Sequence, residues 1–201
     1  MPALLRFLRR LHYVVAPLLV FLVAQLVFLT PFWEHLELKA YDNLFTLCGS
    51  RPVSDDILIV EIDQSTYESI ETASYPYPRN FHARLLRNLF AAGARMVIFD
   101  IQFDVERNPE QDAELVRACA EYRDRVILAG KVEIDRAGSH TMMRRIPPMK
   151  PLLRHLIPWG VVNIRTDTDG FVRRYTLFQR YQEETPYSIG VQALSLLHNP
   201  P

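Results

Sequence analysis

The stretch ILIVEIDQSTYESIETASYPYPRNFHARLLRNLFAAGARMVIFDIQFD, residues 57–104, decides the fold. Two short apolar runs, Ile57–Ile62 and Arg95–Ile101, bracket a segment whose apolar residues recur with helical period. This pattern predicts strand, loop, helix and strand, which is a βαβ unit with a buried parallel sheet. We expect the helix to begin near Asn80 as its N-cap and to end at Gly93, which can adopt the left-handed conformation.

The rest of the chain continues the alternation of helices and strands. The elements predicted after residue 104 are a helix over 110–122, a strand over 125–129 that can continue through 131–134, a turn at 135–139, an irregular segment over 142–154, strands over 160–165 and 171–178 joined by the hairpin loop 166–170, and a last helix over 187–198. Such alternation favours an α/β fold. We therefore predict a three-layer α/β domain with a mainly parallel central sheet plus a late β-hairpin.

Residues 13–33 are predicted to form one N-terminal transmembrane helix. No Asp, Glu, Lys or Arg occurs from Leu11 to Trp33, and the apolar run is long enough to cross a hydrocarbon layer of about 30 Å. A cleaved signal peptide is the competing interpretation, but its apolar core is usually shorter, and no small-x-small cleavage site follows here. Three arginines precede the span, so the positive-inside rule places residues 1–12 in the cytoplasm and residues 34–201 outside it. We expect a single-pass protein of the inner membrane, with its domain in the periplasm or outside the cell.

A short amphipathic helix is predicted to follow the membrane span. Leu36, Ala40, Leu44 and Leu47 recur on one face and form an apolar stripe. We expect this stripe to pack onto the domain, and a contact between two copies of the chain in a homodimer is the alternative.

Composition limits the classes of partner and chemistry. The chain of 201 residues has a formal net charge of zero, so no nucleic acid is expected as a partner. Its two cysteines, Cys48 and Cys119, are interpreted as small buried apolar residues, and a disulfide between them stays open. No cofactor is predicted, because the sequence has no Gly-rich phosphate loop, no Gly-x-Ser-x-Gly motif and no histidines at metal-ligand spacing.

Carboxylates gather near the ends of the two strands predicted first. Glu61 and Asp63 lie at the end of the first strand, and Asp100 and Asp104 lie at or just after the end of the second. Open α/β sheets bind ligands at this edge. Because like charges repel, the carboxylates need a counter-charge, for which Arg79, Arg173, Arg174 or a metal ion are candidates.

A stiff loop with two prolines, Tyr75–Arg79, is expected to lie over this edge and to bring Arg79 to the carboxylates. We favour an arginine–carboxylate network that fixes the loops, over a ligand- or cation-binding mouth and over catalysis. The candidates for ligand binding or for a conformational switch are Glu61, Asp63, Tyr75, Tyr77, Arg79, Asp100, Asp104 and Arg173. No catalytic residue and no metal ligand is assigned.

A family pattern runs through most of the chain. The residues that carry it are Glu37, Tyr41 and Asp42 after the membrane helix, Ile62 and Asp63, Tyr75–Arg79, His82, Ala83, Leu85, Leu86 and Leu89, Ala92–Ala94, Phe99, Asp100 and Phe103, Asp112, Pro147 and Pro148, Gly160 and Asn163, and Asp169, Gly170, Arg173 and Arg174. In this order and spacing they resemble the N-terminal and central part of the type-two CHASE domain, the cyclase and histidine-kinase associated sensory extracellular domain.

The resemblance implies an extracytoplasmic sensory domain that usually precedes further membrane helices and a cytoplasmic nucleotide cyclase, histidine kinase or serine/threonine kinase. The chain departs from the family pattern by having Tyr where Trp is common in the loop, and by ending before the rest of the domain. We therefore expect a domain that is incomplete at its C-terminus and an output module outside this chain.

We expect a membrane-anchored sensor module without catalytic activity that binds a small-molecule or peptide ligand of unknown identity. The alternative is a membrane-anchored metal-dependent hydrolase that uses Glu61, Asp63 and Asp100.

Overall fold

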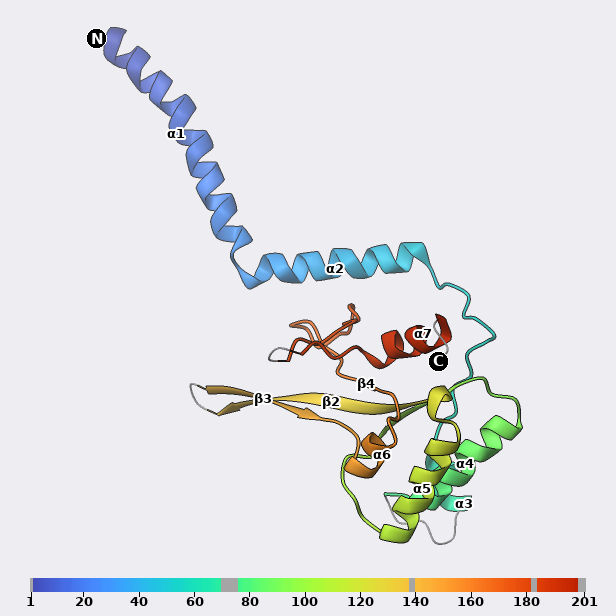
Figure 1. The fold of residues 1–201 in the computed structure, drawn as a ribbon. Helices are drawn as coiled ribbons and strands as arrows, with labels where there is room; N and C mark the ends of the chain where they lie inside the picture. The colour runs from blue at the N-terminus through green and yellow to red at the C-terminus, as the bar shows by residue number, and fades with distance from the viewer. Residues whose placement is uncertain (1, 70–75, 138–139, 182–183, 199–201) are drawn as a thin grey trace. The chain divides into compact units, whose positions relative to one another are not determined.

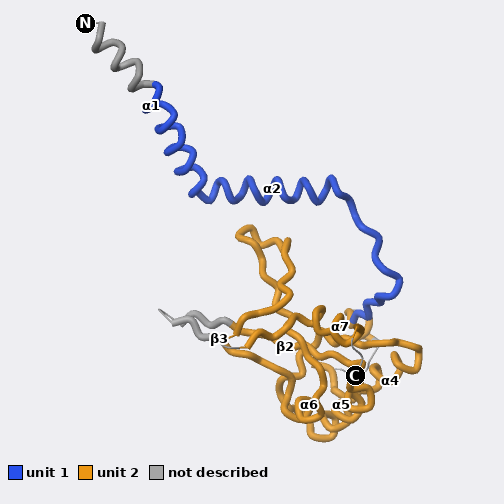
Figure 2. Tube along the Cα trace, turned by 45° about the horizontal axis from the view of Figure 1, so that its top comes forward, with its two compact units in different colours: residues 1–61 blue, residues 62–201 orange. Residues whose placement is uncertain are grey.

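The computed structural model describes the whole chain except residues 1, 70–75, 138–139, 182–183 and 199–201. The chain divides into two compact units, residues 1–61 and residues 62–201 (Figure 2). Each unit is described here by itself.

The first unit consists of two helices, α1 (Pro2–Phe28) and α2 (Pro31–Cys48). Their axes are bent by 72° at the break between them. Proline lacks the N–H that a continuous helix needs, so Pro31 begins a new helix as its first residue, after Thr30 in extended conformation. No single helix among the described residues is both long and apolar enough to cross a membrane, whereas Tyr13–Phe28 and Pro31–Cys48 pass that test as a bent pair. The single membrane helix predicted over residues 13–33 is therefore not confirmed.

The strand predicted over Ile57–Ile62 is wrong. No strand forms there, and the apolar side chains of this segment are exposed, Leu58 by 83 %. A β-strand exists only where its backbone groups bond to a neighbouring strand. Apolar composition predicted burial, but no ladder of hydrogen bonds forms along this run in the described part of the chain. The next element is a short helix, α3 (Gln64–Ser69), which lies where the sequence predicted only loop.

The second unit is built on a mixed sheet with β2 at its centre. Its strands are β1 (Val97–Gln102), β2 (Val126–Ala137), β3 (His140–Ile146) and β4 (Trp159–Val161). Both β1 and β4 pair with the first half of β2 in parallel, and β3 pairs with its second half in antiparallel. The predicted α/β class and the mainly parallel sheet are confirmed.

The predicted late hairpin is corrected. Of its two strands only β4 forms, although the loop between them does turn at Gly170, whose φ is 84°. The antiparallel hairpin is instead β2 and β3, where the sequence predicted irregular structure over residues 142–154. Because β2 is twelve residues long, it extends past its parallel neighbours and offers a free edge to β3.

Helices lie on both faces of the sheet. They are α4 (Arg79–Ala91), α5 (Pro109–Glu121), a 3₁₀ turn (Arg123–Arg125), α6 (Lys150–Arg154) and α7 (Ile189–His198). Figure 1 shows α4, α5 and α6 below the sheet and α7 above it. The helices predicted over residues 80–93, 110–122 and 187–198 are thus confirmed to within about two residues.

The ends of α4 differ in how well they were predicted. Pro78 is its N-cap and supplies no side-chain hydrogen bond, so the assignment of that role to Asn80 is wrong. Gly93 has a φ of 99°, as expected for a residue that ends a helix in the left-handed conformation.

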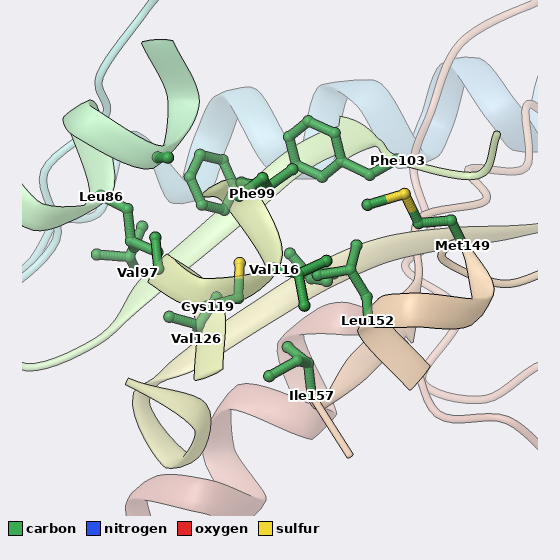
Figure 3. Close-up of a cluster of buried hydrophobic side chains, with 14 of the residues drawn as sticks. Leu86, Val97, Phe99, Phe103, Val116, Cys119, Val126, Met149, Leu152 and Ile157 are labelled. Carbon is green, nitrogen blue, oxygen red and sulfur yellow. The ribbon is translucent and has the colours of Figure 1, made fainter. Parts of the chain in front are cut away.

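The core lies between β1, β2 and the helices α4, α5 and α6 (Figure 3). Its members include Leu86, Val97, Phe99, Phe103, Val116, Cys119, Val126, Met149, Leu152 and Ile157. Burial raises the pKa of the Cys119 thiol to about 12, so it behaves as a small apolar residue. Cys48 is exposed, and both cysteines are free.

Candidate functional site

A buried ion pair joins α4 to α5. Arg79 Nη1 donates to Asp112 Oδ1 over 2.7 Å, and both side chains are buried. The same guanidinium donates to the carbonyl of Val105 and lies 5.7 Å from the centre of the Phe103 ring. The second carboxylate oxygen of Asp112 accepts from the backbone N–H of Arg107 over 2.7 Å. Both carboxylate oxygens of Asp112 and both terminal nitrogens of Arg79 therefore have a hydrogen-bond partner.

The expectation that Arg79 pairs with Asp63 or Asp100 is wrong. Arg79 opens α4, and α4 packs along α5, so the carboxylate that it meets is the one in the first turn of α5. The sequence placed a helix start near residue 110, but which carboxylate reaches Arg79 depends on how the two helices pack.

The four predicted carboxylates differ in their surroundings. Asp63 precedes α3, where its Oδ1 accepts from Thr66 N over 3.0 Å and from the Ser65 and Thr66 hydroxyls over 2.8 Å each. These hydrogen bonds, that from Ser65 foremost, lower the pKa of Asp63 to about 2. Glu61 and Asp100 are exposed, and Asp104 is half-buried.

No three His, Cys, Asp or Glu side chains in the described ranges converge to hold a metal ion. The metal-dependent hydrolase therefore has no support in the arrangement of these residues.

Arg173 belongs to a separate, local network. It donates from Nη1 and Nη2 to both carboxylate oxygens of Asp169, over 2.8 Å and 2.7 Å, and from Nη1 to Asp167 over 3.1 Å. Arg174 reaches the other oxygen of Asp167 over 3.2 Å. The hydrogen bonds from Arg173 hold the pKa of Asp169 well below its usual range. Arg173 thus fixes the turn at Gly170 and does not act as the counter-charge of Asp63 or Asp100.

A pocket of about 230 Å³ lies between α3 and α4. Its lining residues are Ile62, Thr66, Tyr77, Phe81, His82, Arg84, Leu85 and Asn88. Of the two tyrosines predicted as site residues, Tyr77 lines this pocket and is buried, and Tyr75 lies outside the described residues. A role in ligand binding stays a prediction for all eight candidates, including the four carboxylates and the two arginines.

His82 is the buried polar residue of this pocket. Its ring is in edge-on contact with Phe103 at 5.2 Å and with Phe99 at 6.3 Å between ring centres. Burial lowers the pKa of His82, the carbonyl of Pro78 acts in the opposite direction, and the nearby Arg79 cation lowers it further. The imidazole is therefore neutral at pH 7.

From the sequence, His82 was not singled out as a buried or site residue. Leu85, Leu86 and Leu89 follow it at i+3, i+4 and i+7 on the apolar face of α4, and that spacing was the signal for burial.

A second pocket, of about 360 Å³, opens beside β4. Its lining residues are Arg145, Pro158, Trp159, Glu184, Thr185, Pro186, Tyr187 and Gln192. Arg145 pairs with Glu184, and its guanidinium carbon lies 5.8 Å from the centre of the Trp159 ring. Sequence reasoning missed this pocket, because its residues come from three segments that only the fold brings together.

The comparisons with known proteins agree with the sequence pattern. No curated protein and no solved structure matches the chain. The family model of the CHASE2 domain matches residues 17–199, which is nearly the whole chain, and this family consists of extracellular sensory domains. The resemblance seen in the sequence is thereby confirmed, and the chain belongs to the CHASE2 domain family.

Proposed function

We propose that residues 34–201 form an extracytoplasmic sensory module, anchored in the inner membrane by the N-terminal helix, that passes its signal to a cytoplasmic cyclase or kinase outside this chain. The observation that carries the proposal is membership of the CHASE2 family over residues 17–199. The module itself is not an enzyme, in keeping with the sensory character of the family.

The charge distribution along the N-terminal segment supports the anchor. From Leu11 to Phe28, α1 carries no Asp, Glu, Lys or Arg. At 1.5 Å per residue this segment is about 27 Å long, close to the thickness of the hydrocarbon core. Arg6, Arg9 and Arg10 precede it and Glu34 follows it, which favours a cytoplasmic N-terminus.

Reporter fusions test the anchor and its direction. Alkaline phosphatase fused after Pro201 is expected to be active, because it folds only outside the cytoplasm, and green fluorescent protein fused there is expected to stay dark. A matched variant with Arg6, Arg9 and Arg10 all replaced by Gln is expected to reduce the phosphatase signal, because the positive-inside bias is lost. An inactive phosphatase together with a bright fluorescent fusion of the parent chain would reject both the topology and the sensory role outside the cell.

A further inference from the structure

We propose that the pocket between α3 and α4 binds a small carboxylic acid with an apolar body, held by Arg84 at its mouth and by His82 in its wall. The pocket belongs to the second unit alone. Its signalling consequence rests on the proposed sensory function, whereas the binding itself does not.

The first observation is the state of His82. Its residue is only 6 % exposed, and its Nδ1 makes no hydrogen bond of standard geometry among the described residues, although the Pro78 carbonyl lies near enough to act on the pKa of the ring. A buried polar atom without a partner is uncommon, because it forgoes the hydrogen bonds that it would make to water. His82 also lines the pocket, so a molecule bound there lies against the imidazole.

The second observation is the charge at the pocket. Arg84 is exposed, and its guanidinium carbon lies 4.9 Å from the centre of the Phe81 ring, which holds it at the pocket. Within the described ranges no carboxylate pairs with Arg84, and no Asp or Glu lines the pocket. Asp63, which precedes α3, is occupied by hydrogen bonds from Ser65 and Thr66. A planar guanidinium without an anionic partner is the residue that recognises a carboxylate.

The third observation is the size and nature of the walls. The pocket measures about 230 Å³, below the range of about 300–1,000 Å³ that suits drug-sized ligands. Ile62, Tyr77, Phe81 and Leu85 supply apolar and aromatic walls, and Asn88 adds an exposed amide. This combination fits a small molecule with an apolar body and one anionic end, and it is too small for a folded peptide.

The position of the pocket suggests how binding is transmitted. Five of its lining residues lie on α4, whose first residue is Arg79 of the buried pair with Asp112. A ligand that contacts Phe81, Arg84 and Leu85 therefore contacts the same helix that the ion pair connects to α5. A change of state still requires that the ligand bind the two states with different affinity.

The test measures binding to the full chain in lipid nanodiscs by isothermal titration calorimetry. The probes are phenylacetate and hexanoate, with phenylacetamide as a neutral analogue of the first. We expect at least one of the two acids to bind saturably. We expect the Kd of phenylacetamide to be at least about tenfold higher than that of phenylacetate.

Three variants locate the site. Arg84→Gln is expected to weaken the acid about tenfold and to abolish the preference for acid over amide. Leu85→Trp is expected to fill the pocket and to abolish binding. Arg117→Gln removes an exposed arginine of α5 that does not line the pocket, and it is expected to bind as the parent does. Since Arg84 is exposed, Arg84→Gln is expected to keep the fold, which circular dichroism checks. If Leu85→Trp unfolds, the affinity of Arg84→Gln for the two probes still decides whether the proposal holds.

Several results would overturn the proposal. These are no binding of either acid, equal affinity for phenylacetate and phenylacetamide, unchanged affinity in Arg84→Gln, or an equal loss in Arg117→Gln. Failure of the sensory proposal is separate, because the reporter fusions read topology without any ligand. An active phosphatase fusion with no acid binding rejects the pocket proposal alone, and acid binding with an inactive fusion rejects the extracytoplasmic sensor alone.

Discussion

The guanidinium of Arg79 and the carboxylate of Asp112 form a buried ion pair that ties the first residue of α4 to the first turn of α5. The two charged atoms are 2.7 Å apart, and the side chains are 4 % and 7 % exposed. A pair of this kind costs desolvation to form, and the main loss appears when one partner is removed and the other charge stays buried. The pair is therefore the point at which α4 is most sensitive to a change of charge.

Asp112→Asn is expected to lower the free energy of unfolding by roughly 3–5 kcal/mol, because it keeps the shape of the side chain and leaves the Arg79 cation buried without a counter-charge. Chemical denaturation with urea measures the change. Asp100→Asn is the matched control, and since Asp100 is exposed it is expected to stay within about 0.5 kcal/mol of the parent. An equal loss in both variants would show that the network predicted around Asp100 exists after all.

The sequence predicted the elements on either side of this pair better than it predicted the pair. Helix α4 follows from its apolar period, and α5 from the same kind of pattern, because each periodicity is a local property. Arg79 and Asp112 are 33 positions apart, and only the packing of α4 on α5 selects that carboxylate over Asp63 or Asp100.

The strand predictions that failed did so for the same reason, because they too depend on contacts between distant segments of the chain. The run Ile57–Ile62 is as apolar as β1, yet no strand forms along it, because pairing depends on a neighbour and not on composition. Conversely β3, with two methionines and two arginines, was read as irregular and becomes a strand because the long β2 offers it an edge. Pairing over distance in the sequence was the part that could not be predicted.

Arg173→Lys is expected to lower the melting temperature, whereas Arg174→Lys is expected to leave it near that of the parent. The Arg173 side chain is 5 % exposed and contacts both oxygens of Asp169, and lysine cannot reproduce that two-pronged contact. The Arg174 side chain is 74 % exposed, and a surface pair contributes little. Differential scanning calorimetry on the two variants compares them directly, and equal melting temperatures would contradict the structural role of Arg173.

The stability of the second unit is expected to depend on pH through His82. Burial holds the pKa of His82 below the ordinary 6.5 in the folded chain, so below that pH the unfolded chain binds a proton that the folded chain resists. His82 therefore makes its full contribution to the free energy of unfolding above pH 6.5. That contribution is lost as the pH falls from 6.5 towards the lower pKa that His82 has in the folded chain.

His82→Phe removes this titration and keeps a ring against Phe99 and Phe103. Between pH 7.5 and pH 5.5, the melting temperature is expected to fall less in this variant than in the parent. His155→Gln changes an exposed histidine and is expected to keep the pH dependence of the parent. If the melting temperature fell equally with pH in the parent and in His82→Phe, His82 would not be the group responsible for the pH dependence.

A closely packed contact joins β4 to α7 at Gly160. A β-carbon on Gly160 would lie 2.4 Å from the Cα of Ile189, which is backbone and cannot swing aside. Gly160→Ala is therefore expected to push the start of α7 away from β4 and to cost roughly 1–3 kcal/mol, the usual range for overpacking.

Gly190→Ala is the matched substitution, one residue after Ile189 on α7, and it faces a side chain in place of backbone. Its β-carbon would lie 3.1 Å from the Tyr175 hydroxyl oxygen, the far end of a side chain that is exposed and can turn. Alanine also favours the helix over glycine by about 1 kcal/mol, which offsets the cost of moving Tyr175. Urea denaturation of the two variants is expected to show a clear loss for Gly160→Ala and little change or a gain for Gly190→Ala. If Gly160→Ala kept the stability of the parent, α7 would not depend on the absence of a side chain at Gly160.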